Sequence, residues 1–253
     1  MENYLDSTLT PEPKNNNIDV ITLVDGINCF GFLISLIFLI NSTSTTLYKF
    51  FIISIVLVHA ILFVKTVFPH FQIEADIAQR LVLCSDFHYL TIALLFFISK
   101  VCPLSYIFLY ILLFGVRAFS FCFKYILPLT PANDSPIVDR INEVITSPLI
   151  IKLPSYVEIV LEVQLLINAF IDFRIMTWIS FIAYSFWILI FNFANNEVHS
   201  KIWTSASIWL REYAAQNAET FGPNLEIVVD KVTEFANIVA QFYPTKELKV
   251  HLQ

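Results

Sequence analysis

Charged residues, glycine and cysteine are all scarce in this chain. Only 14% of its 253 residues are Asp, Glu, Lys or Arg, where roughly a quarter is usual for a soluble domain. A soluble fold of this length must present much polar surface to water, so the scarcity argues against one. Four glycines exclude a collagen repeat, and four cysteines are too few for a disulfide-dense scaffold. The net charge of −6 is the opposite of a basic nucleic-acid-binding face, so no direct nucleic-acid binding is expected.

Apolar residues are abundant instead, at 57% of the chain, and 25 of them are phenylalanine. Since a spanning helix needs ~20 mainly apolar residues, the sequence predicts an all-α polytopic membrane protein with about six hydrophobic helices. Four segments are strong: 20–40, 47–68, 104–127 and 175–194. Two are weaker: 77–98 contains Arg80, Asp86 and His88, and 155–171 contains Glu158 and Glu162. A charge near the bilayer centre costs at least ~2.5 kcal/mol, so both four and six crossings stay open.

Prolines divide the chain, because proline breaks the interior of a helix. All eleven fall outside the six segments, at their edges or in linkers. The predicted organisation is a disordered N-terminal tail (1–17), four membrane helices (18–127), a polar proline-rich linker (128–153), two further membrane helices (154–195), cytoplasmic amphipathic helices (199–243) and a short tail (244–253). A short helix is expected within the linker at 137–145.

Lysine and arginine are distributed unevenly about these segments. With six crossings and a cytoplasmic N-terminus, eleven lie on the cytoplasmic side and three on the lumenal side. If the two weaker segments do not cross, the division becomes nine against five. Either count favours a topology with both termini in the cytoplasm, by the positive-inside rule.

After residue 199 the apolar positions recur at helical spacing, which predicts two amphipathic helices joined by a turn. Two interpretations of their apolar face stay open. It contacts the lipid bilayer or a partner, or it packs on the protein's own helices. Residues 199–253 have a net charge of −1, so strong attraction to anionic lipid is not expected. The residues of this face are Trp203, Trp209, Leu210, Leu225, Val228, Val232, Phe235 and Val239.

No catalytic box is present. His70 and Glu74 are four residues apart but lack the second histidine of a zinc protease, and the cysteines lack metal-site spacing. Neither enzymatic activity nor a cofactor or metal is expected. Arg117 and Glu162 are the polar residues deepest in their segments, and we expect Arg117 to pair with Glu162 or Glu158. The alternatives for Arg117 are a transport path or a side chain that snorkels to the interface.

One stretch of the sequence is specific enough to indicate a family. The run Pro69-His70-Phe71-Gln72 stands sixteen residues before His88-Tyr89-Leu90. This arrangement resembles the transmembrane protein 33 family, which includes fungal pore-membrane nucleoporin relatives. The order of apolar segments, polar linker and amphipathic tail also agrees with that family.

The resemblance implies a non-enzymatic protein of the endoplasmic reticulum and nuclear envelope, active in tubular network organisation and nuclear pore organisation. It implies partners among reticulon-type proteins, nucleoporins or a nuclear import receptor, and a homo-oligomer is compatible with it. Two other functions stay open: a small channel or transporter subunit with Arg117, Glu162 and His59 along a path, or a structural subunit of a larger membrane complex.

Overall fold

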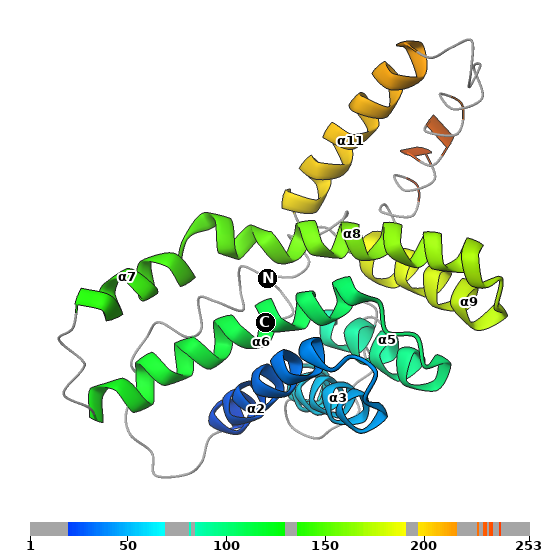
Figure 1. Cartoon of the computed structure of the whole chain (residues 1–253). Helices are drawn as coiled ribbons and strands as arrows, with labels where there is room; N and C mark the ends of the chain where they lie inside the picture. The colour runs from blue at the N-terminus through cyan, green and yellow to red at the C-terminus, as the bar shows by residue number, and fades with distance from the viewer. Residues whose placement is uncertain are drawn as a thin grey trace.

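The computed structural model describes residues 20–68, 81, 84–129, 136–190 and 197–216, with six single positions between 227 and 238. The predicted tails at 1–17 and 244–253 lie outside these residues. All regular elements described are helical, as the composition predicts, and Figure 1 shows a bundle from which α11 projects. The helices are α2 (Val20–Ile40), α3 (Thr45–Val67), α5 (Ser85–Ser99), α6 (Leu104–Phe121), α7 (Pro136–Ile145), α8 (Pro148–Asp172), α9 (Ile175–Tyr184) and α11 (Glu197–Gln216).

Two of these helices change pitch at their C-terminal ends. α6 continues through a π-helical turn, η1 (Cys122–Ile126), and a 3-10 turn, η2 (Leu127–Leu129). α9 continues as the π-helical segment η4 (Ser185–Ile190). The predicted segment at 175–194 is therefore helical as far as the described residues reach.

Three helices are long and apolar enough to cross a membrane: Ile21–Ile40, Thr45–Val67 and Leu104–Leu129. A fourth crossing arises if α7 and α8, which are bent by 41° relative to each other, are counted as one broken span. α5 has 15 residues, and at ~1.5 Å per residue it measures ~22 Å, less than the ~30 Å hydrocarbon core. The described chain is thus all-helical, with three or up to four candidate membrane spans, and the predicted count of six is not confirmed.

The start of α8 corrects the predicted boundary at Pro154. α8 begins at Pro148 and contains Pro154 in its interior, so the linker ends earlier than the sequence pattern indicates. Ser147 caps the helix, since its hydroxyl accepts a hydrogen bond from the Ile150 amide at 3.4 Å. A serine cap followed by proline at the first helical position is a strong start signal. The short helix expected in the linker is present as α7.

Six helices pack as a closed ring of neighbours (Figure 1). The ring runs α2–α3–α5–α9–α8–α6 and back to α2, and α11 contacts α8. Aromatic rings fill the centre: Tyr106 lies edge-on to Phe96 at 4.7 Å and to Tyr110 at 5.0 Å between ring centroids. Since lipid is as apolar as these side chains, close packing and interhelical hydrogen bonds hold the bundle together.

The outer faces of the spanning helices are apolar and exposed, which suits contact with lipid chains. A shallow apolar depression of about 380 Å³ lies between α2 and α3. Large exposed apolar residues on these helices include Leu33, Ile40, Ile53, Leu57 and Phe108.

Candidate functional site: a buried polar network

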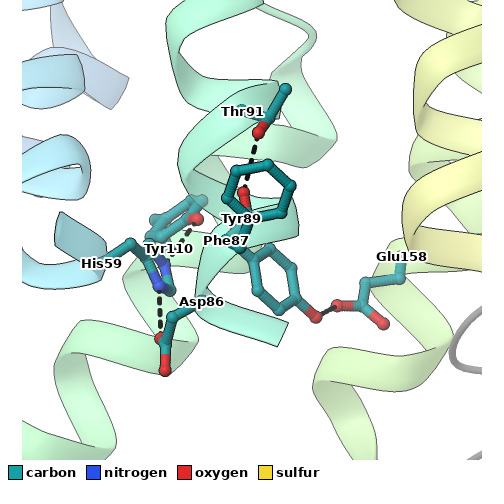
Figure 2. Close-up of polar contacts among 7 residues, drawn as sticks. All are labelled: His59, Asp86, Phe87, Tyr89, Thr91, Tyr110 and Glu158. Atoms are coloured by element: carbon teal, nitrogen blue, oxygen red, sulfur yellow. Dashed lines mark hydrogen bonds and ion pairs between the residues drawn. The ribbon is translucent and has the colours of Figure 1, made fainter. Parts of the chain in front are cut away.

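A histidine inside a spanning helix forms the first part of the network. His59 of α3 is buried, and its Nδ1 lies 2.8 Å from Oδ1 of Asp86, at the start of α5. Its other nitrogen, Nε2, lies 3.0 Å from the hydroxyl of Tyr110 on α6. Figure 2 shows the imidazole held between these two side chains. Because Asp86 accepts from Nδ1–H, a neutral His59 accepts at Nε2 from the Tyr110 hydroxyl.

A second histidine–carboxylate contact lies on the other side of α5. Tyr89 stands one helical turn after Asp86, and its hydroxyl donates to Oε1 of Glu158 on α8. The second oxygen of Glu158 accepts from Nε2 of His199 on α11, at 2.6 Å. The Tyr89 ring stacks on the His59 ring, with centroids 5.2 Å apart. The network therefore runs from α3 through α5 to Glu158 of α8, as Figure 2 shows, and from Glu158 to His199 of α11.

All four charged or chargeable members are deeply buried. Their residues expose 8% (His59), 5% (Asp86), 2% (Glu158) and 0% (His199) of their surface. An unpaired charge in such surroundings is costly, and pairing with hydrogen bonds on both sides offsets the loss of water. Removing one member leaves the other buried and uncompensated. Chemically, the network acts to hold five helices in one arrangement, and its last contact holds the base of α11.

The expected pair of Arg117 with Glu162 is wrong. Arg117 Nη1 lies 4.0 Å from Oδ1 of Asp25 on α2. On α8, Oε1 of Glu162 accepts from the hydroxyl of Ser185, at the start of η4, while Oε2 has no hydrogen-bond partner among the described residues. The carboxylate of Glu158, the other expected partner, accepts from Tyr89 and His199, and its backbone carbonyl accepts from the Tyr184 hydroxyl at 3.4 Å. Arg117 lies near Asp25 because the face of α6 that contains Arg117 packs against α2.

Other polar groups are buried without a partner near the same helices. Within the described part of the chain, no hydrogen bond reaches Thr177 Oγ1, His199 Nδ1 or Trp203 Nε1. No set of three or more His, Cys, Asp or Glu side chains among the described residues is arranged to hold a metal ion. His59, Arg117 and Glu162 belong to three separate sets of contacts, and none of them lines the depression between α2 and α3.

The predicted amphipathic face is described only along α11. Trp203 is half-buried and packs against the core, and Leu210 is half-buried. Trp209 is 60% exposed, and its ring stacks on Tyr213 at 5.6 Å. The face thus emerges from the bundle along the helix, from the fully buried His199 to the exposed Trp209. The remaining face residues, Leu225, Val228, Val232, Phe235 and Val239, lie outside the described residues.

The two halves of the family-like motif are described unequally. Pro69, His70, Phe71 and Gln72 lie outside the described residues. His88 and Tyr89 are on α5, where His88 is buried and Tyr89 links the two histidine–carboxylate contacts. Tyr89 therefore has a structural role that its position in the sequence does not indicate.

Sequence inspection identified Asp86, Glu158 and His59 as polar residues in apolar segments, but not their pairing. His199 was missed altogether, since it lies where an ordinary polar helix begins. Scans of the chain against protein-family models, curated proteins and solved structures found no match. Its function is therefore inferred from the chain's own residues.

Proposed function

We propose that this chain is a non-enzymatic integral membrane protein of the endoplasmic reticulum and nuclear envelope that shapes membranes. It acts by holding an amphipathic region against the bilayer or a membrane-bound partner. The observation that carries the proposal is the placement of α11. Its base is fixed by His199 against Glu158, and its outer part presents Ile208, Trp209 and Tyr213 at the surface.

The geometry of α11 fits contact with a membrane interface. Its 20 residues measure ~30 Å at ~1.5 Å per residue, so a helix fixed at one end reaches well beyond the bundle, as Figure 1 shows. Tryptophan and tyrosine prefer the boundary between headgroups and acyl chains, where the ring is apolar and the polar edge stays wet. The stacked pair Trp209–Tyr213 offers both.

The sequence motif supports the proposed location and partners, and the charge distribution supports the proposed topology. The Pro-His-Phe-Gln to His-Tyr-Leu stretch favours the reticulum and nuclear envelope, with reticulon-type proteins, nucleoporins or an import receptor as partners. The excess of lysine and arginine on one side favours cytoplasmic termini. Asn41, in the turn between α2 and α3, starts an Asn-Ser-Thr sequon that this topology places next to the lumenal membrane surface.

Membrane shaping is tested with the full chain reconstituted in liposomes. We expect tubules or smaller vesicles with the natural protein, seen by electron microscopy, and a marked loss with Trp209→Glu. Thr204→Glu is the matched control, because Thr204 is an exposed polar residue of the same helix. Equal remodelling by the natural chain and Trp209→Glu would remove α11 from the mechanism, and no remodelling by the natural chain would refute membrane shaping.

Location and topology are tested in cells and in sealed microsomes. A tagged chain should mark the reticulum and the nuclear rim, and a C-terminal tag should be digested by added protease. Residence in another organelle would favour a structural subunit of a different membrane complex. Protection of the tag would place the C-terminus in the lumen and contradict the proposed topology.

A further inference from the structure

The short helix α7 has two chemically opposite faces. Its ten residues place Asp139, Arg140, Asn142 and Glu143 on one side. The positions between them, at the spacing of a 3.6-residue period, are apolar and include Val138, Ile141, Val144 and Ile145. The polar and apolar residues of this short helix are clearly separated. Such a helix is stable where one face meets an apolar environment and the other meets water.

Among the described residues the apolar face is only partly covered, since Val138 and Ile145 are half-buried while Ile141 and Val144 are exposed. Val144 is 58% exposed and Ile141 is 38% exposed. Near the ends of the linker, Leu129 of η2 is 85% exposed and Leu149 of α8 is 69% exposed. Ile141 and Val144 make up the α7 patch, and exposing such large apolar side chains to water is unfavourable.

The position of α7 in the chain keeps it close to the membrane. Six residues, 130–135, separate η2 from α7, and they span at most ~20 Å. The end of α6 has features of an interface, since the Lys124 ammonium lies 5.2 Å from the centre of the Tyr125 ring. Figure 1 shows α7 beyond the N-terminal end of α8, on the side of the bundle away from α9.

The charges of α7 decide between a surface and a spanning position. Asp139, Arg140 and Glu143 are all exposed, and placing any of these charges near the bilayer centre would be costly. At the surface the same three charges stay in water while the apolar face enters the lipid. With two acidic groups and one basic group, the helix has no attraction to anionic lipid, so insertion depends on apolar contact.

We propose that α7 lies on the membrane surface with the α7 patch inserted at the boundary of headgroups and acyl chains. This contact is separate from α11 and does not depend on the proposed membrane-shaping function. It fixes the linker between α6 and α8 to the bilayer, so the chain has an anchored surface helix in the middle of its membrane region.

The test uses neighbouring residues on opposite faces of α7. The full chain is prepared with its four cysteines replaced by alanine, and Val144→Cys or Glu143→Cys then carries an environment-sensitive fluorophore. Each protein is reconstituted in phosphatidylcholine vesicles with brominated acyl chains, which quench fluorophores that touch them. We expect a several-fold larger loss of fluorescence at position 144 than at position 143, unchanged by salt.

Three outcomes would overturn the proposal. Quenching at both positions would place α7 inside the bilayer as part of a bent span with α8. A position 144 that is shielded from both lipid and water would mean that protein, such as a second copy, covers the patch. A fully water-exposed position 144 would mean that nothing covers it.

A second measurement uses the unmodified chain, in case the cysteine-free protein does not fold. Vesicles containing a phosphatidylcholine with a photoreactive group on its acyl chain are irradiated, and labelled sites are mapped by mass spectrometry. Labels on Ile141 and Val144, with few on Asn142 and Glu143, support the surface position. Absence of label from the whole of α7, with α6 labelled, contradicts it.

Discussion

The ring of Phe114 on α6 occupies the space that a side chain at Gly31 of α2 would need. A Cβ atom at Gly31 would lie 2.6 Å from Cε2 of Phe114. The following residue on each helix makes the opposite contact, with the glycine on α6 and the phenylalanine on α2. A Cβ at Gly115 of α6 would lie 3.1 Å from Cε2 of Phe32. Two glycines thus let two phenylalanines interlock, and small residues at such crossings allow membrane helices to approach closely.

Gly31→Ala should therefore destabilise the bundle. The added methyl group meets a buried ring, and overpacking of this kind costs about 1–3 kcal/mol. Thermal unfolding in detergent measures the effect, and Phe114→Leu in the same chain should recover part of it. Gly26→Ala is the matched control on the same helix, because nothing lies within 4 Å of its Cβ position. Equal behaviour of the two alanine variants would refute the close approach.

His199→Ala should release the base of α11. Glu158 then stays buried without its histidine, and breaking a buried pair in this way costs about 3–5 kcal/mol. Hydrogen exchange should rise along α11, first in the turn that contains Trp203, while α2 and α3 stay protected. Thr204→Ala, which alters an exposed side chain of the same helix, should leave exchange unchanged. Protection of α11 that survives His199→Ala would show that apolar packing alone holds it.

Arg117 and Asp25 should behave as a coupled pair in a double-mutant cycle. Their side chains are 20% and 12% exposed and 4.0 Å apart, so Arg117→Met leaves a largely buried carboxylate without its nearest cation. Asp25→Asn should recover part of the lost stability in that background. The effects of Arg117→Met and Glu162→Gln should instead add within about 0.5 kcal/mol, as for independent sites. Coupling to Glu162, or no effect of Arg117→Met, would contradict the observed pairing.

The thiols beside α5 should react slowly at neutral pH. Burial, with a smaller contribution from the Asp86 carboxylate, raises the pKa of Cys84 to about 11, and burial raises the pKa of Cys102 to about 12. Since the thiolate is the reactive form, alkylation of either residue should be slow at pH 8 and should rise about tenfold per pH unit.

Mass spectrometry after timed alkylation measures both thiols, with Thr204→Cys on α11 as a fast-reacting exposed reference. These thiols ionise more easily in the unfolded chain, where a cysteine thiol has its ordinary pKa of 9.0. The stability that they contribute is therefore present below pH 9 and is lost as the pH rises through about 11 for Cys84 and about 12 for Cys102. Rapid alkylation of Cys84 or Cys102 in the folded protein at pH 8 would contradict their raised pKa values.

The sequence alone determined the helical membrane class and several helix bounds. The predicted segment 20–40 coincides with α2, and the helix expected at 137–145 is α7. Such features depend on runs of apolar residues and on helical periodicity, which neighbouring residues encode locally. The sequence also indicated that 77–98 is a poor membrane span, because it contains Arg80, Asp86 and His88.

Only the tertiary structure decided the partners of the buried polar residues. Arg117 has carboxylates on several segments as candidates, and its pairing with Asp25 follows from the packing of α6 on α2. Glu158 meets Tyr89 and His199, which are 69 and 41 residues away along the chain. The position of Pro154 inside α8 was likewise not predicted, because every proline was treated as a helix boundary. Apolar periodicity specifies which face of a helix is buried, but a hydrogen bond depends on where a distant helix places its side chain, and that is set by the packing of the whole bundle.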